Sequence, residues 1–260
     1  HHGSIRRQRQ MCIRDRLKAL QLLVHQAGEA IMQVYQTADF GIETKTDNSP
    51  VTKADLDAHY CLIDGLAKLT PNIAIVSEED PTSHIVPQTH NCYWLIDPLD
   101  GTKEFINRNG QFTVNLALME DNAPSFGFVS TPIDQTLYWG GKHLGAWRLR
   151  DNTLEQLHTQ ASQTPMRVVA SRSHLNEATR NFIANLGDTA LIQAGSSLKL
   201  IRIAEGEADI YPRLAPTCEW DTAAAQAVLE GSGGKVAQVD GSPMQYGKAD
   251  ILNPYFVARS

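Results

Sequence analysis

Long apolar runs and patterned cysteines are both missing from this chain. No apolar segment reaches the roughly 18 residues that a membrane-spanning helix needs, and the start lacks the pattern of a secretory leader. The widely separated cysteines form no CxxC pair, which argues against a zinc site and a disulfide framework: Cys12, Cys61, Cys92 and Cys218. We expect a cytoplasmic protein in a reducing compartment, with a peripheral position at the inner membrane as the alternative.

Runs of one charge are also scarce. The formal net charge is -6, and no long run of one sign occurs beyond the first sixteen residues. A nucleic-acid groove or a membrane-binding face is therefore disfavoured, as is an enzyme that cleaves nucleic acid. An anionic small molecule would need local positive charge, and bound metal ions are one source.

The chain divides into an extension and two expected lobes. Residues 1–16 begin with His-His-Gly-Ser and continue as a basic stretch without helical or strand periodicity, so we interpret them as a tag or other non-native extension. The hydrophobic content of 42% supports a sizeable core in the remainder. We expect an N-terminal α+β lobe over residues 17–150 and a C-terminal α/β lobe over 151–260, with a boundary that rests only on the polar stretch 150–156.

Apolar periodicity predicts a layered α/β fold. Spacings of three and four predict a helix over residues 17–35 and a second that begins at Thr52 or Lys53 and ends before Pro71. Short apolar runs predict strands at 73–76, 93–96, 112–119, 126–130 and 136–139. The second half then alternates: strand 167–170, helix 176–186, strand 189–193 and helix 197–204.

A predicted strand ends in the most informative motif, Asp97-Pro98-Leu99-Asp100-Gly101-Thr102. Proline fixes its own φ and glycine adopts angles closed to other residues, so the turn can bring both aspartates to one point. The segment 103–106 could begin a helix whose free N–H groups favour a phosphate. Taken alone, two acids at this spacing after a strand are more often part of a capped turn.

Three other segments carry acids at predicted element ends. Glu78 follows a strand, Asp221 precedes an alanine-rich helix, and Asp55 lies in the first turn of the second helix. Each also has an ordinary local interpretation. Glu78 could belong to a solvated loop, Asp221 could be an N-cap, and Asp55 could be a favourable charge at a helix start. Hard oxygen ligands of this kind suit Mg²⁺.

The Glu-Glu-Asp loop, the Asp-Pro-Leu-Asp-Gly-Thr turn and the Trp-Asp-Thr-Ala-Ala helix start resemble, in that order, the signature of the inositol monophosphatase-like superfamily. Within it, the chain is most similar to the bacterial 3'(2'),5'-bisphosphate nucleotidases of sulfate assimilation. The resemblance runs from about Leu17 to the C-terminus, and the first sixteen residues match nothing in the family.

The resemblance implies alternating helix and sheet layers, as in fructose-bisphosphatase, with a metal cleft between two lobes. It implies hydrolysis of adenosine 3',5'-bisphosphate to AMP and phosphate by metal-activated water, with two or three Mg²⁺ ions and sensitivity to Li⁺. Carried over by position, the metal ligands are Glu78, Asp97, the carbonyl of Leu99, Asp100 and Asp221. Asp55 and Thr102 orient and deprotonate the water, with Glu78 as a further catalytic residue.

The substrate-binding residues implied by the same resemblance are Gly101, Thr102, Gly195, Ser196, Ser197, Lys199, Arg213 and Asp221. From local sequence alone, Ser197 could be simply a helix cap and Lys199 simply a solvated surface residue. The alternatives are an inositol monophosphatase or a fructose-1,6-bisphosphatase on the same scaffold, or a non-catalytic metal- or phosphate-binding protein. We expect a monomer or homodimer with no nucleic-acid partner.

Overall fold

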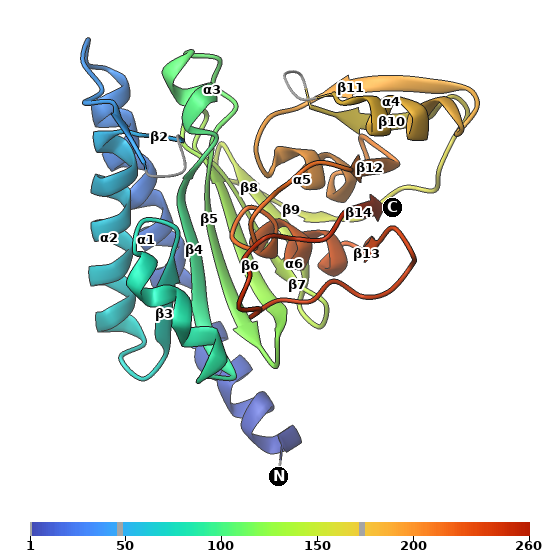
Figure 1. The fold of residues 1–260 in the computed structure, drawn as a ribbon. Helices are drawn as coiled ribbons and strands as arrows, with labels where there is room; N and C mark the ends of the chain where they lie inside the picture. The colour runs from blue at the N-terminus through green and yellow to red at the C-terminus, as the bar shows by residue number, and fades with distance from the viewer. Residues whose placement is uncertain (1, 46–48, 172–174) are drawn as a thin grey trace.

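The computed structural model describes residues 2–45, 49–171 and 175–260. Helices and sheets alternate in layers (Figure 1). Helices α1 and α2 cover one face of a seven-stranded sheet, α6 packs on its other face, and a five-stranded sheet lies beyond. None of the helices in the described part is long and apolar enough to span a membrane.

The helices are α1 His2–Tyr35, α2 Lys53–Leu69, η1 Pro81–Gln88, α3 Thr102–Ile106, α4 Glu177–Ala184, α5 Leu198–Ala204 and α6 Ala223–Gly231. Strands β1 Glu43–Thr44 and β2 Pro50–Val51 form a small hairpin. The large sheet contains β3 Ala74–Ser77, β4 Cys92–Asp100, β5 Thr113–Glu120, β6 Ala123–Thr131, β7 Thr136–Gly141, β8 Gly145–Arg150 and β9 Thr153–Leu157. The smaller sheet contains β10 Met166–Ala170, β11 Thr189–Gln193, β12 Ile210–Arg213, β13 Lys235–Gln238 and β14 Phe256–Arg259.

Helix α1 starts earlier than expected. The segment 2–16, predicted to lack helical order, continues the same helix. Arginine, glutamine and methionine have good helix propensities, so a helix can extend beyond its buried face without an amphipathic pattern. That buried face begins near Leu20 and includes Val24 and Ile31. The non-native origin of residues 1–16 stays a prediction.

The seven-stranded sheet runs in sequence order from β3 to β9, and all neighbours are antiparallel except the parallel β3–β4 pair. The boundary expected near residue 150 falls in the tight β8–β9 hairpin, where Arg150 pairs with Thr153. The sheet therefore continues to Leu157. Strand β9 has an exposed polar pattern because it is the sheet edge, and a polar edge strand resembles a loop in sequence.

Helix α6 joins the two sheets. A Cβ added at Gly127 of β6 would lie 2.3 Å from the carbonyl oxygen of Ala224, so only glycine allows this close approach. One continuous core contains Val129 from the large sheet, Val228 from α6 and Phe256 from the small sheet. The two expected lobes thus share a hydrophobic core, and the N-terminus of α6 is fixed against the large sheet.

Candidate metal and phosphate site

The parallel β3–β4 pair places Glu78 beside Asp97. Ser77 pairs with Ile96, and the Glu78 N–H donates to the Ile96 carbonyl at 3.2 Å. Strand β3 ends at Ser77, whereas β4 continues to Asp100, so Glu78 leaves the sheet beside Asp97, which still pairs with Asn115 of β5. A register shift between Asp97 and Asp100 marks the start of the predicted turn.

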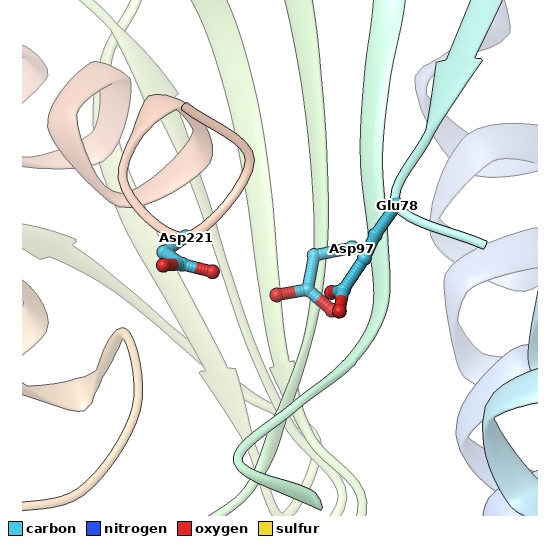
Figure 2. A group of neighbouring side chains, drawn as sticks. All are labelled: Glu78, Asp97 and Asp221. Carbon is cyan, nitrogen blue, oxygen red and sulfur yellow. The ribbon is translucent and has the colours of Figure 1, made fainter. Parts of the chain in front are cut away.

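Asp221 reaches the same point from the opposite side, from the turn before α6 (Figure 2). Its Oδ2 accepts a hydrogen bond from the Cys218 N–H at 2.8 Å. Asp221, Glu78 and Asp97 each offer one carboxylate oxygen, and these oxygens lie within 4.8 Å of one another. Three carboxylates predicted from separate segments are therefore brought together.

The electrostatics of this cluster favour a bound cation. Asp97 is buried, its Oδ1 accepts from the Leu99 N–H at 3.1 Å, and its Oδ2 has no hydrogen-bond partner among the described residues. Burial, with the neighbouring Glu78 charge, raises the pKa of Asp97 well above its usual range. Burial and then Asp100 raise the pKa of Asp221 to about 8. A metal ion would relieve this repulsion, and the hard oxygen donors suit Mg²⁺.

Asp100 lies outside the three-carboxylate cluster but beside it. Its Oδ2 accepts from the Ser197 N–H at 2.6 Å and the Ser197 hydroxyl at 2.8 Å. The side chains of Asn115, at 3.3 Å, and Thr113, at 3.4 Å, donate to the same oxygen. Because every donor uses Oδ2, Oδ1 is the oxygen left to bind a ligand.

Asp55 and Thr102 meet although 47 positions separate them: the Thr102 hydroxyl donates to Asp55 Oδ1 at 3.0 Å. The other oxygen, Oδ2, accepts from the N–H and hydroxyl of Thr52 at 2.7 and 2.6 Å in a capping box. Burial raises the pKa of Asp55, although these hydrogen bonds act against the increase. Asp55 lies in the first turn of α2 as predicted, takes part in a capping box that was not predicted, and still accepts from Thr102.

The turn between the aspartates exposes backbone to the site. Leu99 has a buried side chain, so its carbonyl oxygen, 3.4 Å from the Thr102 hydroxyl, is the group it can offer. Gly101 has φ +94°, in the left-handed region, and a Cβ there would lie 3.2 Å from the Gln111 carbonyl oxygen. Glycine is required here both for backbone conformation and for space.

A cavity of about 130 Å³ adjoins the carboxylates. Seven predicted site residues line it: Asp100, Gly101, Ser196, Ser197, Lys199, Arg213 and Asp221. Gly195 is not among the lining residues; a Cβ there would lie 3.0 Å from Gln111, so this glycine permits close packing behind the cavity. The cavity thus joins acidic groups to two cations.

Those two cations are held in different ways. Burial lowers the pKa of Lys199 to about 8, and its ammonium lies 5.9 Å from the centre of the Tyr211 ring. Arg213 donates from Nε to the Ala215 carbonyl at 3.1 Å and from Nη2 to the Pro216 carbonyl at 2.6 Å. Backbone carbonyls therefore orient the guanidinium without neutralising it.

Ser197 has a role that its local sequence did not predict. It makes no side-chain cap bond to α5. Its hydroxyl lies 2.8 Å from Asp100 Oδ2 and 2.9 Å from the Asp221 carbonyl oxygen and can donate to either, and it accepts from Asn115 at 2.7 Å. The residue therefore links two of the predicted ligands across the two halves of the chain.

Lys45 was missed by the sequence argument. Its ammonium lies 2.7 Å from a carboxylate oxygen of Glu78 and of Glu79. Burial raises the pKa of Glu78 and the Lys45 charge opposes this increase. No local signal could identify Lys45, because the contact crosses 33 positions.

The turn that carries Asp221 is wrapped by residues 246–253, here called the C-terminal strap. The buried carboxylate of Glu219 accepts from the backbone N–H groups of Gly247, at 2.8 Å, and Lys248, at 3.2 Å. The Lys248 ammonium also donates to it. These bonds anchor the turn two residues before Asp221.

A second anchor of the strap is Asn253, also buried. Its Nδ2 donates to the Cys218 carbonyl at 2.7 Å and to the Thr222 hydroxyl oxygen at 3.0 Å. Tyr246 lies with its hydroxyl 3.0 Å from that of Thr222. Both sides of Asp221 are therefore fixed by residues about 30 positions later in the chain, which sequence reasoning also missed.

Comparison with known proteins identifies relatives along nearly the whole chain. Residues 14–258 match the model of the inositol monophosphatase family. The 3'(2'),5'-bisphosphate nucleotidase CysQ of Escherichia coli K12 is 44% identical over 236 residues, which cover 90% of this chain and 95% of that protein. The CysQ of Haemophilus influenzae is 34% identical, with coverages of 93% and 91%.

Solved structures give the same result. The crystal structure of CysQ from Bacteroides thetaiotaomicron, described as a bacterial member of the inositol monophosphatase family, matches with a TM-score of 0.82 and 37% identity, covering 94% of this chain and 97% of that one. An IMPase of Thermotoga maritima matches with a TM-score of 0.77 at 22% identity, covering 94% and 92%. The second similarity concerns the fold alone.

Proposed function

Because the chain belongs to the inositol monophosphatase family, as its sequence motifs predicted, we propose that it is a 3'(2'),5'-bisphosphate nucleotidase of sulfur assimilation. The substrate is adenosine 3',5'-bisphosphate, and the products are AMP and phosphate. The observation that carries this proposal is one cavity that joins metal-binding carboxylates to Lys199 and Arg213. Identity of 44% to the Escherichia coli enzyme supports the same substrate class.

The family depends on metal ions, and we assign two or three Mg²⁺ ions to this site. The ligands are Glu78, Asp97, the Leu99 carbonyl, Asp100 and Asp221, and the unpartnered Oδ2 of Asp97 supports this set. When bound, Mg²⁺ lowers the pKa of a water and offsets charge on the phosphoryl oxygens. The charge of Lys45 opposes the effect of burial on the pKa of Glu78 and so favours the ionised form that binds metal.

Asp55 and Thr102 act on the attacking water. The Thr102 hydroxyl donates to Asp55, so its oxygen is left to accept a hydrogen bond from the water. As the water oxygen bonds to phosphorus, a water proton passes to the Thr102 oxygen and the Thr102 hydroxyl proton passes to Asp55. The ester P–O bond breaks, and the ribose oxygen leaves and takes a proton from solvent water. The raised pKa of Asp55 makes it a stronger base than an exposed aspartate. Glu78 helps to orient the same water.

The remaining cavity residues hold the substrate. The N–H groups of Gly101 and Thr102 face the phosphate being cleaved. Lys199 and Arg213 bind the second phosphate, which inositol monophosphate lacks, and the orientation of Arg213 by two carbonyls supports this role. Ser196, Ser197 and Asp221 contact the ribose side of the cavity, and Gly195 allows close packing behind it.

The test is phosphate release from adenosine 3',5'-bisphosphate, inositol 1-phosphate and fructose 1,6-bisphosphate, each with Mg²⁺ and with a chelator. We expect strong, chelator-sensitive preference for the nucleotide and a lower rate in millimolar Li⁺. Preference for inositol or fructose phosphate would overturn the substrate, and no release from any would favour a non-catalytic binding protein. The cytoplasmic location and the choice between monomer and homodimer stay predictions.

A further inference from the structure

Glu104 is a cavity-lining acid that the proposed mechanism does not use. It lies on α3, three residues after Gly101, and its Oε2 is 3.4 Å from the position that a Cβ would take at Gly101. Its carboxylate makes no hydrogen bond or ion pair with a described residue, whereas Asp100 in the same cavity accepts several. Glu104 is therefore an acceptor without a donor in a cavity built for an anion.

An ionised carboxylate in this position needs a specific partner. It accepts hydrogen bonds and donates none, and it repels any phosphate that approaches. Lys199 lies close enough for electrostatic attraction to Glu104 but forms no ion pair with it. A substrate that fills the cavity must therefore present a neutral donor to Glu104 and keep its phosphates elsewhere.

The position of Glu104 decides which donor this is. It adjoins Gly101, whose N–H is assigned to the phosphate being cleaved, so its partner must lie next to that phosphate. On a nucleoside bisphosphate, the nearest donor is the ribose hydroxyl on the adjacent carbon, while the adenine amino group is farther away. We propose that Glu104 accepts a hydrogen bond from this vicinal hydroxyl, an inference that rests on the proposed function.

The same contact works for either position of the cleaved phosphate. With a 3'-phosphate the donor is the 2'-hydroxyl, and with a 2'-phosphate it is the 3'-hydroxyl. One carboxylate can thus serve both isomers, since each isomer has one phosphate and one hydroxyl on neighbouring carbons. Glu104 is thus a specificity-determining residue that favours a sugar with a hydroxyl next to the cleaved phosphate.

The test removes the donor and the acceptor of the proposed hydrogen bond separately, the donor from the substrate and the acceptor from the enzyme. Adenosine 3',5'-bisphosphate and its 2'-deoxy analogue are assayed with the native enzyme and with Glu104→Ala. We expect the native enzyme to prefer the ribonucleotide by about 10- to 100-fold in kcat/KM, as for a hydrogen bond to a charged group. In the variant this preference should fall to about 3-fold or less, because the loss affects the ribonucleotide alone.

The matched control is Lys103→Ala, an exposed neighbour on the same helix, which should retain the full preference. Glu104→Gln keeps an acceptor oxygen and should show an intermediate preference, which covers the case in which the alanine variant does not fold. Equal losses on both nucleotides would overturn the role of Glu104 and leave the proposed function standing. No turnover of the ribonucleotide by the native enzyme would overturn both.

Discussion

Asp97 has a buried carboxylate with one oxygen that no described donor reaches, and two acids lie against it. Asp97→Asn should lower kcat by at least about 10³-fold, because a metal ligand is lost. It should also raise the melting temperature of the chelator-treated protein by roughly 2–6 °C, because asparagine avoids the cost of burying this carboxylate beside other acids. Phosphate release and thermal unfolding with and without Mg²⁺ measure the two effects.

The control for this variant is Asp64→Asn, an exposed change on α2 that should alter neither value. A folded Asp97→Asn enzyme that keeps its activity would refute the central role of this residue. Lower stability of the chelated variant would instead show that the Asp97 charge is well solvated or paired.

Substitutions of Thr102 can distinguish an effect on water activation from an effect on metal binding. Thr102→Val removes the hydroxyl that bonds Asp55 while nearly preserving shape, so kcat should fall by about 10²- to 10³-fold. The Mg²⁺ concentration for half-maximal activity should change by less than about 3-fold, because no carboxylate ligand is touched. Thr102→Ser keeps the hydroxyl and should recover most of the rate. A large shift in Mg²⁺ requirement for the valine variant would place Thr102 among the ligands instead.

At the scale of elements, the C-terminal strap holds the turn that carries Asp221. Asn253→Asp keeps the size of the side chain but replaces its donor group with an acceptor facing the Cys218 carbonyl. We expect Mg²⁺ affinity, measured by calorimetry on the protein without substrate, to fall by about 10-fold, since Asp221 loses its fixed position.

Asp250→Asn is the matched control for the strap. It changes an exposed residue of the same segment, whose side chain can still accept from the Leu252 N–H. Its Mg²⁺ affinity should equal that of the native protein. Unchanged affinity in Asn253→Asp would mean that the turn keeps its shape without the strap.

Elements with strong periodicity were also the ones that the sequence predicted well. Helix α2 begins after Thr52 and ends before Pro71 as expected, because its cap and its apolar face are local signals. Strands β12, β13 and β14 were not predicted. Their pairing depends on partners far along the chain, which no local pattern records.

For the whole molecule, the raised carboxylate pKa values make the metal-free protein sensitive to pH. A folded state with raised acid pKa values binds protons that the unfolded chain releases, so stability is highest below about pH 4 for these groups and falls as pH rises. For Asp221 the fall continues to about pH 8. Between pH 6.5 and 8, we expect the chelated protein to lose about 1–2 kcal/mol of unfolding free energy.

The interval from pH 6.5 to 8 is chosen because the other titrating groups with shifted pKa values raise the stability only slightly within it. The pKa of buried His59 is lowered, and the unfolded histidine, with a pKa near 6.5, loses only its remaining half proton in this interval, which raises stability by at most about 0.4 kcal/mol. The lowered pKa of Lys199, about 8, favours the folded state mainly at higher pH. Chemical unfolding at both pH values measures the loss, which saturating Mg²⁺ should abolish. Stability that rises with pH in chelator would contradict the raised carboxylate values.

The sequence by itself determined the family, the main helices and the identity of the candidate site residues. The acid-bearing turns are contiguous motifs, so they can be recognised without knowledge of the fold. It identified Asp97 and Asp100 from one strand end and Asp55 from one helix start. Each also had an ordinary local role, and the capping box at Asp55 shows that both roles can hold at once.

Only the tertiary structure decided how these acids meet and what supports them. Parallel pairing of β3 and β4 sets Glu78 beside Asp97, and the packing of α6 through Gly127 brings Asp221 opposite. The contacts of Lys45 and of the strap likewise join segments about 30 positions apart. Such contacts arise from burial and strand register, which depend on the whole folded chain, so a local motif specifies the chemistry but not its geometry.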